Sequence, residues 1–221
     1  MMKKYHLAVP VVFFLCAMSS FSQKSHVMDL HRLVKKKGIE VYNRELSLID
    51  EESYPGIRLS KEYGEGVAWL KGINFSEGIL EFDVRGEDIY QHSFVGIAFH
   101  GQNDSTFEAI YLRPFRFKEK DEILKLHGIQ YISLPKFTWR VLRANSPGIY
   151  EGLIEPAPDP NSWVRVRIVI RDSMISTYIN GNNEPSLVVK EITHSKSGSI
   201  GFYVADTSGG DFANISITKS N

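Results

Sequence analysis

The sequence predicts an all-β protein built as an antiparallel β-sandwich. Apolar and polar residues alternate with a period of two in a series of short stretches, which is typical of half-buried strands. Gly, Asn, Asp and Pro separate these stretches, as they do where turns join strands. Only one stretch has helical spacing, so strands rather than helices must supply the layers around the core.

The one expected helix lies near residue 30. Apolar residues recur with the spacing of a single helix face at Val27, Leu30, Leu33 and Val34. Three lysines and Gly38 follow, and cations and a glycine are common at a helix C-terminus. We predict strands and turns for the rest of the chain.

The clearest alternation is found at 79–84, 94–100, 108–115, 163–171 and 174–180. Apolar residues alternate with arginines in 163–171, and Asp172-Ser173 then joins this strand to the next as a hairpin. The second strand of the hairpin ends in Asn180-Gly181, which supplies the positive φ angles of a tight turn. These turns predict antiparallel neighbours.

We expect one domain, from residue 27 to residue 221. No linker rich in Gly, Ser or Pro divides the chain, and no segment is repeated. The Pro-rich stretch 155–160 has strand patterns on both sides. We therefore interpret it as a stiff surface loop rather than a domain boundary.

Residues 1–22 have the layout of a secretory signal peptide. Lys3 and Lys4 precede an apolar stretch at 7–18, and the small residues Ser20 and Ser22 precede an expected cleavage before Gln23. The apolar stretch is too short to cross about 30 Å of hydrocarbon. We expect an exported protein, periplasmic or extracellular, with no membrane span in the mature chain.

Composition and charge exclude several classes of function. The single cysteine, Cys16, lies within the expected signal peptide, so the mature chain would have no disulfide, thiolate metal site or cysteine nucleophile. A lipid-attachment role for Cys16 is the alternative, but Leu15 is bulky for it. Removal of Lys3 and Lys4 with the signal leaves 24 basic against 26 acidic residues, a net charge of −2. A nucleic-acid partner is therefore not expected.

Three segments resemble a known superfamily. They are FSEGILEFDVRG at 75–86, SFVGIAFHGQNDSTFEAIYLRPFRF at 93–117 and GSIGFYVADTSGGDFANISI at 198–217. Together with the hairpin they make the chain similar to concanavalin A-like lectins and glucanases. Within this superfamily it is most similar to laminin-G-like and 3-keto-disaccharide hydrolase-type domains, which are related to the glycoside hydrolase family 16 jelly roll. The resemblance implies two stacked sheets, with ligands in the groove of the concave one or at its rim.

Strand parity assigns candidate binding residues. The residues suited to the core are Val95, Ile97, Phe99, Ile110 and Leu112, which leaves Phe94, Gly96, Ala98, His100, Ala109, Tyr111 and Arg113 on the opposite face. Tyr111 and Arg113, with Trp139 and Arg143, are the candidate substrate-binding residues. Aromatic planes stack on sugar rings, and guanidinium groups donate to sugar hydroxyls. The alternative is half-buried packing for the aromatic residues and exposed strand positions for the arginines.

Glu108, His100 and Asp206 are the candidate catalytic residues. Glu108 is near Tyr111 and Arg113 in sequence, and a carboxylate among aromatic and cationic neighbours can act as an acid or base. Its parity nevertheless places it with the core residues. The alternative for Glu108 is therefore a buried carboxylate paired with an arginine.

The catalytic residues of family 16 glucanases are not carried over to this chain. Their retaining mechanism uses two carboxylates on one strand in a spacing such as E-x-D-x-x-E, which places the two groups on either side of the scissile bond. The closest string here, Glu81-Phe82-Asp83 followed by Glu87-Asp88, lacks the second glutamate at that spacing.

Calcium is the one cofactor considered. The loop 206–211 offers oxygen ligands, with Asp206 and Asp211 as the candidate metal-binding residues. The resemblance to laminin-G-like domains points in the same direction. The alternative is an ordinary glycine-rich turn before the last strand.

Three functions remain open. The first is a secreted carbohydrate-binding domain that holds a glycan on the concave face without chemistry. The second is an enzyme that acts on a glycoside or a modified (3-keto) disaccharide, with acid and base drawn from the catalytic candidates. The third is a scaffold or adhesion domain of the cell envelope.

Overall fold

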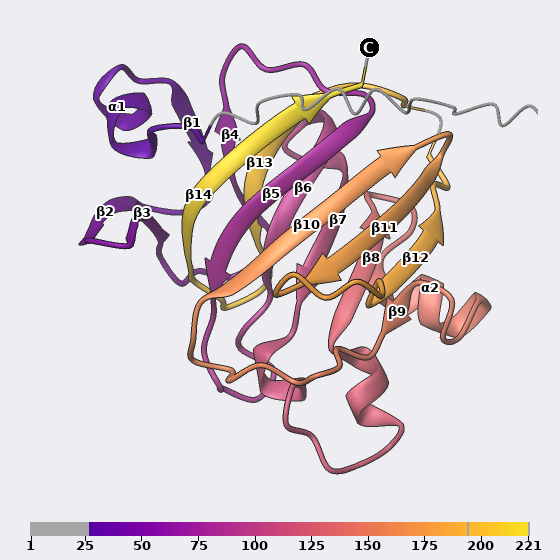
Figure 1. Cartoon of the computed structure of the whole chain (residues 1–221). Helices are drawn as coiled ribbons and strands as arrows, with labels where there is room; N and C mark the ends of the chain where they lie inside the picture. Colours follow the sequence, from indigo (N-terminus) through magenta and orange to yellow (C-terminus); the bar gives the residue numbers. More distant parts are fainter. Residues whose placement is uncertain (1–26, 194, 221) are drawn as a thin grey trace, which may run out of the picture.

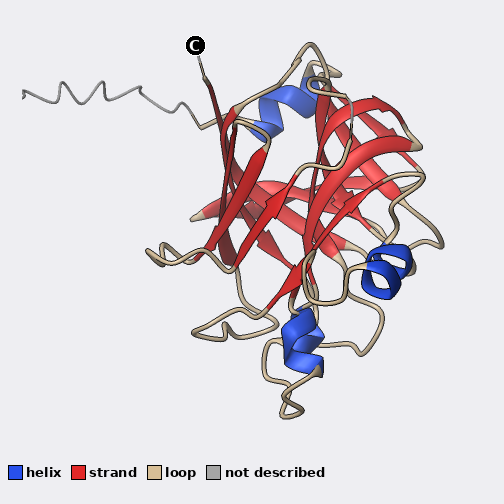
Figure 2. Cartoon of the chain, turned by 90° about the vertical axis from the view of Figure 1, so that its right-hand side faces the viewer, coloured by secondary structure: helices blue, strands red, loops and turns tan. Residues whose placement is uncertain are grey.

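Two antiparallel sheets stack face to face in the computed structural model, which describes residues 27–193 and 195–220. Figures 1 and 2 show the two layers of strands with the short helices at their edges. The predicted all-β sandwich is confirmed. The expected signal peptide, residues 1–22, lies outside the described residues.

The first layer, called the β5 sheet, has seven strands in the order β12-β11-β10-β5-β14-β3-β2. All of its neighbouring strands are antiparallel. The bounds are β12 (Leu187–Lys190), β11 (Met174–Ile179), β10 (Val164–Arg171), β5 (Gly78–Arg85), β14 (Gly210–Lys219), β3 (Tyr54–Leu59) and β2 (Leu46–Glu51).

The second layer, called the β6 sheet, also has seven antiparallel strands, in the order β1-β4-β13-β6-β7-β8-β9. The bounds are β1 (Ile39–Tyr42), β4 (Gly66–Leu70), β13 (Ser199–Val204), β6 (Val95–Asn103), β7 (Thr106–Leu112), β8 (Ile129–Ser133) and β9 (Glu151–Gly152). It lies behind the β5 sheet in the view of Figure 1.

The helices depart partly from the prediction. The expected helix forms as α1 (Leu30–Lys35), but α2 (Trp139–Asn145) and the 3₁₀ helices η1 (Pro114–Arg116) and η2 (Leu124–His127) were not predicted. The expected strand 108–115 ends at Leu112, because Pro114 has no N–H to donate to a ladder. The side chain of Thr138 caps α2 by accepting from the Val141 amide. None of the described helices is long and apolar enough to cross a bilayer.

The two predicted turns have the expected backbone. Asp172 and Ser173 have φ values of 52° and 63°, and β10 pairs with β11 on either side of them. Asn180 and Gly181 have φ values of 51° and 73°. These positive angles match the twist of a tight hairpin.

Aromatic contacts between the layers form the centre of the core. The ring of Phe202 in β13 lies 4.8 Å from that of Phe212 in β14 and 6.5 Å from that of Phe82 in β5. Phe202 pairs with Ile97, which pairs with Ile110, so these two residues share its inward face. The predicted core parity of β6 and β7 is therefore confirmed at this position.

A buried hydrogen-bond network lies at one end of the core. His100 Nδ1 donates to Glu108 Oε1 at 2.8 Å, and His100 Nε2 donates to the Ser76 carbonyl at 2.7 Å. The Tyr131 hydroxyl donates to the other carboxylate oxygen of Glu108. Each ring nitrogen of the imidazole faces an oxygen, an arrangement that favours a proton on both nitrogens. The surroundings of His100 therefore favour its imidazolium form.

The network connects the two sheets. Ser76 lies two residues before β5, and Glu191 directly follows β12, whereas His100 and Glu108 belong to β6 and β7. Glu191 Oε1 lies 3.8 Å from His100 Nδ1, and Lys196 Nζ lies 2.6 Å from Glu191 Oε2. Two cations thus balance two buried carboxylates.

Two sequence expectations are corrected here. His100 was expected on the face opposite the core, but it has a φ of 50° and the β6–β7 register shifts between Phe99 and Asn103, so this bulge turns its side chain inward. The alternative expectation for Glu108 was an arginine partner. The carboxylate is indeed buried, but its partners are His100 and Tyr131.

The network makes stability depend on pH. Burial alone disfavours the charged imidazole, but the hydrogen bonds that His100 donates to Glu108 and Ser76 and the charges of Glu108 and Glu191 outweigh it and raise the pKa of His100. A raised folded pKa gives stabilisation that is complete below the unfolded value of about 6.5 and is lost as pH rises through the folded value.

We therefore expect Glu108→Gln to lower the free energy of unfolding by about 3 kcal/mol at pH 6 and by less at pH 9. Urea unfolding of both proteins at the two pH values measures this difference. The control is Glu52→Gln, because Glu52 is exposed. A loss that is equal at both pH values would contradict a charged His100.

Candidate functional site

A row of cross-strand neighbours forms the floor of the candidate site on the outer face of the β6 sheet. Tyr203 pairs with Gly96, Gly96 with Tyr111, and Tyr111 with Gln130. The rings of Tyr111 and Tyr203 approach to 5.8 Å across the glycine between them. A Cβ at Gly96 would lie 2.0 Å from the Ile110 carbonyl oxygen and 2.6 Å from Tyr111 Cα. Only glycine therefore fits this position.

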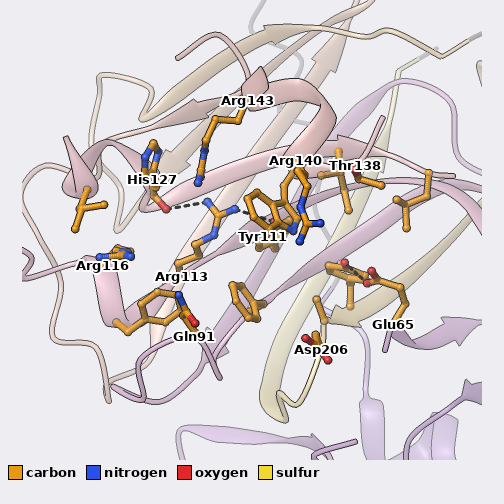
Figure 3. A pocket seen from close by; sticks show the side chains of 18 residues that line it. Glu65, Gln91, Tyr111, Arg113, Arg116, His127, Thr138, Arg140, Arg143 and Asp206 are labelled. Atoms are coloured by element: carbon orange, nitrogen blue, oxygen red, sulfur yellow. Dashed lines mark hydrogen bonds between the residues drawn. The ribbon is translucent and has the colours of Figure 1, made fainter. Parts of the chain in front are cut away.

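A cavity of about 380 Å³ opens over this floor. Its walls come from segments that follow β7 and β8, namely η1, η2 and α2, and from the turn after β13. Figure 3 shows the lining side chains. The polar ones among them are Glu65, Gln91, Tyr111, Arg113, Arg116, His127, Thr138, Arg140, Arg143, Tyr203 and Asp206.

Arg113 lies at the centre of the cavity lining (Figure 3). It is only 5% exposed, and its guanidinium donates to the His127 carbonyl at 3.0 Å, the Tyr111 hydroxyl at 3.0 Å and Gln130 Oε1 at 3.1 Å. These three bonds use three of its five N–H donors. Its guanidinium carbon also lies 5.1 Å from the centre of the Tyr111 ring. Burial lowers the pKa of Arg113, and the charge of Arg143 adds to this effect.

Helix α2 brings a second group of side chains to the cavity. Trp139 is 39% exposed, and the guanidinium groups of Arg140 and Arg143 lie 5.3 and 5.0 Å from the centre of its indole. Arg143 also binds both carboxylate oxygens of Glu151, with Nη2 2.6 Å from Oε2. The indole thus positions two cations as well as offering an exposed aromatic surface.

His127 lies between these arginines and Glu151. Its buried Nδ1 is 3.0 Å from Glu151 Oε2 but makes no hydrogen bond among the described residues. Burial lowers the pKa of His127, and the neighbouring arginines lower it further against the opposing charge of Glu151. The imidazole is therefore neutral near pH 7.

The carboxylates of the lining lie at another part of the cavity, beside β13 (Figure 3). The Tyr203 hydroxyl donates to Glu65, and the Gly64 amide lies 3.5 Å from Asp206 Oδ1. Burial raises the pKa of Glu65, and the charge of Asp206 acts in the same direction, while the Tyr203 hydrogen bond and the charge of Arg44 oppose them. The cavity therefore has a cationic part and an acidic part.

The structure brings together most of the sequence-predicted binding residues. Tyr111, Arg113, Trp139, Arg143 and Asp206 all line this one cavity. Their distant positions in sequence meet because β7, α2 and the turn after β13 converge on the outer face of the β6 sheet. Their binding role stays a prediction.

His100 and Glu108 lie elsewhere. Along β7, Glu108 has the parity of the inward residues and Tyr111 that of the outward ones, so the sheet separates the pair from the cavity. Each is 1% exposed. Among the described residues, His100, Glu108 and Glu191 are the group of three whose ligand atoms lie within 4.8 Å of one another, as a metal site requires. His100 donates to Glu108 and to the Ser76 carbonyl, and Lys196 lies against Glu191, so these ligand atoms already have partners without a metal.

Asp211 does not share a site with Asp206. The two residues line different cavities. Both oxygens of Asp211 accept from arginines, with Arg58 Nε 2.6 Å from Oδ1 and Arg85 Nη2 2.7 Å from Oδ2. Calcium binding by this pair stays a prediction, and the arginines on Asp211 do not favour it.

Sequence reasoning did not single out six polar residues of the cavity lining: Glu65, Gln91, Arg116, His127, Thr138 and Tyr203. Arg116 and His127 lie on short helices that were expected to be strand or turn, and Thr138 caps α2. The signal for α2 was present as Thr138 before an apolar and basic stretch, with Pro147-Gly148 after it. Nothing local marks Glu65, because its position depends on the long-range contact with Tyr203.

Comparison with known proteins supports the fold. No family model and no curated protein matches the chain. Among solved structures, the carbohydrate-binding module CBM66 from Bacillus subtilis aligns with a TM-score of 0.59 and 13% identity over 80% of this chain and 93% of its own. A galectin-like protein of unknown function from Bacillus subtilis aligns with a TM-score of 0.57 and 15% identity over 89% of this chain and 98% of its own.

A third similar structure is the exoplasmic/lumenal domain of VIP36, solved with Ca²⁺ and Man3GlcNAc. It aligns with a TM-score of 0.54 and 9% identity over 83% of this chain and 84% of its own. These folds are concanavalin A-like jelly rolls, so the resemblance stated from the sequence is confirmed for the fold. Similarity at 9–15% identity supports the fold but says nothing about the function of this chain.

The close packing around Gly96 predicts that one added methyl group will lower the stability of the protein. We expect Gly96→Ala to lower the free energy of unfolding by about 2 kcal/mol, because the new Cβ would collide with the backbone of β7. Chemical denaturation provides the measurement. The control is Gly128→Ala, where the nearest atom to a new Cβ is 3.5 Å away. Equal stability of the two variants would show that the floor is not tightly packed.

Proposed function

We propose that the protein is an exported carbohydrate-binding domain that holds a saccharide in the cavity on the outer face of the β6 sheet. The observation that carries the proposal is the cavity itself, whose lining combines guanidinium groups and aromatic rings in one part with carboxylates in another. A pyranose has an apolar face and a ring of hydroxyls that both donate and accept. The lining offers a partner for each of these features.

The accessible parts of the lining fit this use. Tyr111 and Tyr203 are almost fully buried and form a rigid floor, whereas Trp139 exposes its indole at the edge. The spare N–H donors of Arg113 match hydroxyl or carbonyl oxygens, and Asp206 can accept from hydroxyl groups. One of the similar structures is named a carbohydrate-binding module and another was solved with Man3GlcNAc bound, which supports the same partner class.

Binding is tested by calorimetry of the purified protein against a panel of oligosaccharides. We expect Trp139→Ala to weaken binding of a hit by about tenfold, because an exposed indole contributes about 1–2 kcal/mol of contact and positions two arginines. The matched control is Trp163→Ala, since Trp163 stacks on Tyr54 at 4.7 Å and bonds Glu51 of the β5 sheet. Equal losses in both variants, or no hit in the panel, would reject the proposed site.

A glycoside-cleaving enzyme is the second candidate, and the acidic part of the cavity is what favours it. Burial raises the pKa of Glu65, which suits a general acid, while Asp206 is exposed and suits a base. Of the catalytic residues expected from the sequence, only Asp206 lines the cavity. In such an enzyme the general acid would therefore be Glu65 rather than Glu108.

Product analysis of every bound glycan tests the enzyme. If the protein cleaves a glycan, Glu65→Gln is expected to lower turnover at least about a hundredfold, because a general acid contributes that much. Glu62→Gln is the control, since Glu62 is exposed and lies outside the cavity lining. Binding without any product would reject the enzyme and leave the binding domain.

A further inference from the structure

The arginines of the cavity are only partly balanced by carboxylates. Arg116 Nη1 lies 2.6 Å from Glu119 Oε2, and Arg143 Nη2 lies 2.6 Å from Glu151 Oε2. In the described part of the chain, neither Arg113 nor Arg140 has a carboxylate within ion-pair distance. The lining therefore contains two guanidinium groups without an ion-pair partner. Glu151 attracts Arg113 from a greater distance, but Arg143 already binds that carboxylate.

Arg113 is the more informative of the two because it is buried. Its three hydrogen-bond acceptors, described above, are all neutral. A buried cation without an anion loses its hydration and regains little of it through neutral dipoles. Buried arginines elsewhere in proteins are usually paired. The position of Arg113 is costly for the free protein, and a bound anion would remove that cost.

The acidic residues of the lining do not supply the missing charge. Glu65 and Asp206 lie beside β13 in Figure 3, away from the guanidinium of Arg113. Arg44 is attracted electrostatically to both of them, so a cation outside the lining already serves this acidic part. Glu65 is also held by the Tyr203 hydroxyl.

We propose that the ligand of this cavity carries a negatively charged group, a carboxylate or a sulfate, that binds Arg113, with Arg140 adding attraction at the rim. The inference rests on the proposed function and names its substrate class: acidic rather than neutral saccharides. A hydrogen bond from a guanidinium to a charged oxygen is shorter and stronger than one between neutral groups. Tyr111 and Gln130 take both hydrogens of Nη2 and the His127 carbonyl takes one of Nη1, so Arg113 keeps its Nε–H and one Nη1–H for single hydrogen bonds of this kind.

The first measurement compares matched ligands. Calorimetry is run with oligogalacturonides, their methyl esters, 6-O-sulfated and unsulfated galactose oligosaccharides, and a wider glycan panel. Thermal shift with free glucuronate, glucose and inorganic sulfate tests the anion separately from the sugar. We expect the hits to be acidic and their neutralised forms to bind at least about tenfold more weakly, since a charge-assisted pair contributes about 1.5–3 kcal/mol. Comparison of the affinities for carboxylated and sulfated ligands identifies which anion the cavity prefers.

Three variants locate the charge. Arg113→Met and Arg140→Gln are expected to reduce the preference for acidic over neutral ligands, and Arg167→Gln to leave it unchanged. Arg167 is the control because it lies on β10 in the other sheet, against Tyr178. Arg140 is exposed on α2, so its variant tests the proposal even if the buried Arg113 variant does not fold.

The outcomes separate the two proposals. Equal affinity for acidic and neutral saccharides would overturn this inference and leave the carbohydrate-binding function standing. Arginine-dependent binding of simple anions without any glycan hit would support the anion site and overturn the carbohydrate function. No response to anions or glycans would overturn both.

Discussion

The charged hydrogen bond between His100 and Glu108 fixes how β6 and β7 face each other, and the cavity depends on that pairing. A strand presents alternate side chains to alternate faces, so a slip of one residue would exchange the two sets. With Glu108 held inward by His100 and Tyr131, Tyr111 and Arg113 must point outward. The bulge that turns His100 inward is what makes this bond possible. A polar contact in the core thereby determines which residues line the outer face.

The cavity combines a rigid floor with charged walls. Gly96 allows two tyrosine rings to meet across it, and the Tyr111 hydroxyl then orients the Arg113 guanidinium. Gln130, the next residue in the same row, accepts from the same Arg113 nitrogen, Nη2, through Oε1, while its own amide group donates to the Tyr131 and Tyr150 carbonyls. Each group that touches Arg113 is thus itself held by another. Such preorganisation reduces the conformational entropy that a ligand must overcome on binding.

The regular part of the molecule could be predicted from sequence, and the irregular part could not. Period-two patterns located β5, β6, β10 and β11, because a strand with one face in the core repeats its apolar residues locally. Parity placed Tyr111 and Arg113 on one face for the same reason. The face of His100 was predicted wrongly because one bulge residue reverses the alternation of side chains along β6. Helix α2 was not predicted because it is too short to give a periodic signal. Glu65 could only be found from the three-dimensional structure, because β4 and β13 are more than a hundred residues apart.

Most of the cavity wall consists of two continuous pieces of chain inserted between neighbouring strands. Residues 113–128 link β7 to β8, and residues 134–150 link β8 to β9, and neither insertion supplies a central strand of the sandwich. Substitutions at the exposed positions of these two links would reshape the pocket while their buried side chains, such as Phe117 and Leu142, kept their packing in the core. The same framework is therefore suited to diversification: a library confined to the two links would search for new ligands on an unchanged floor.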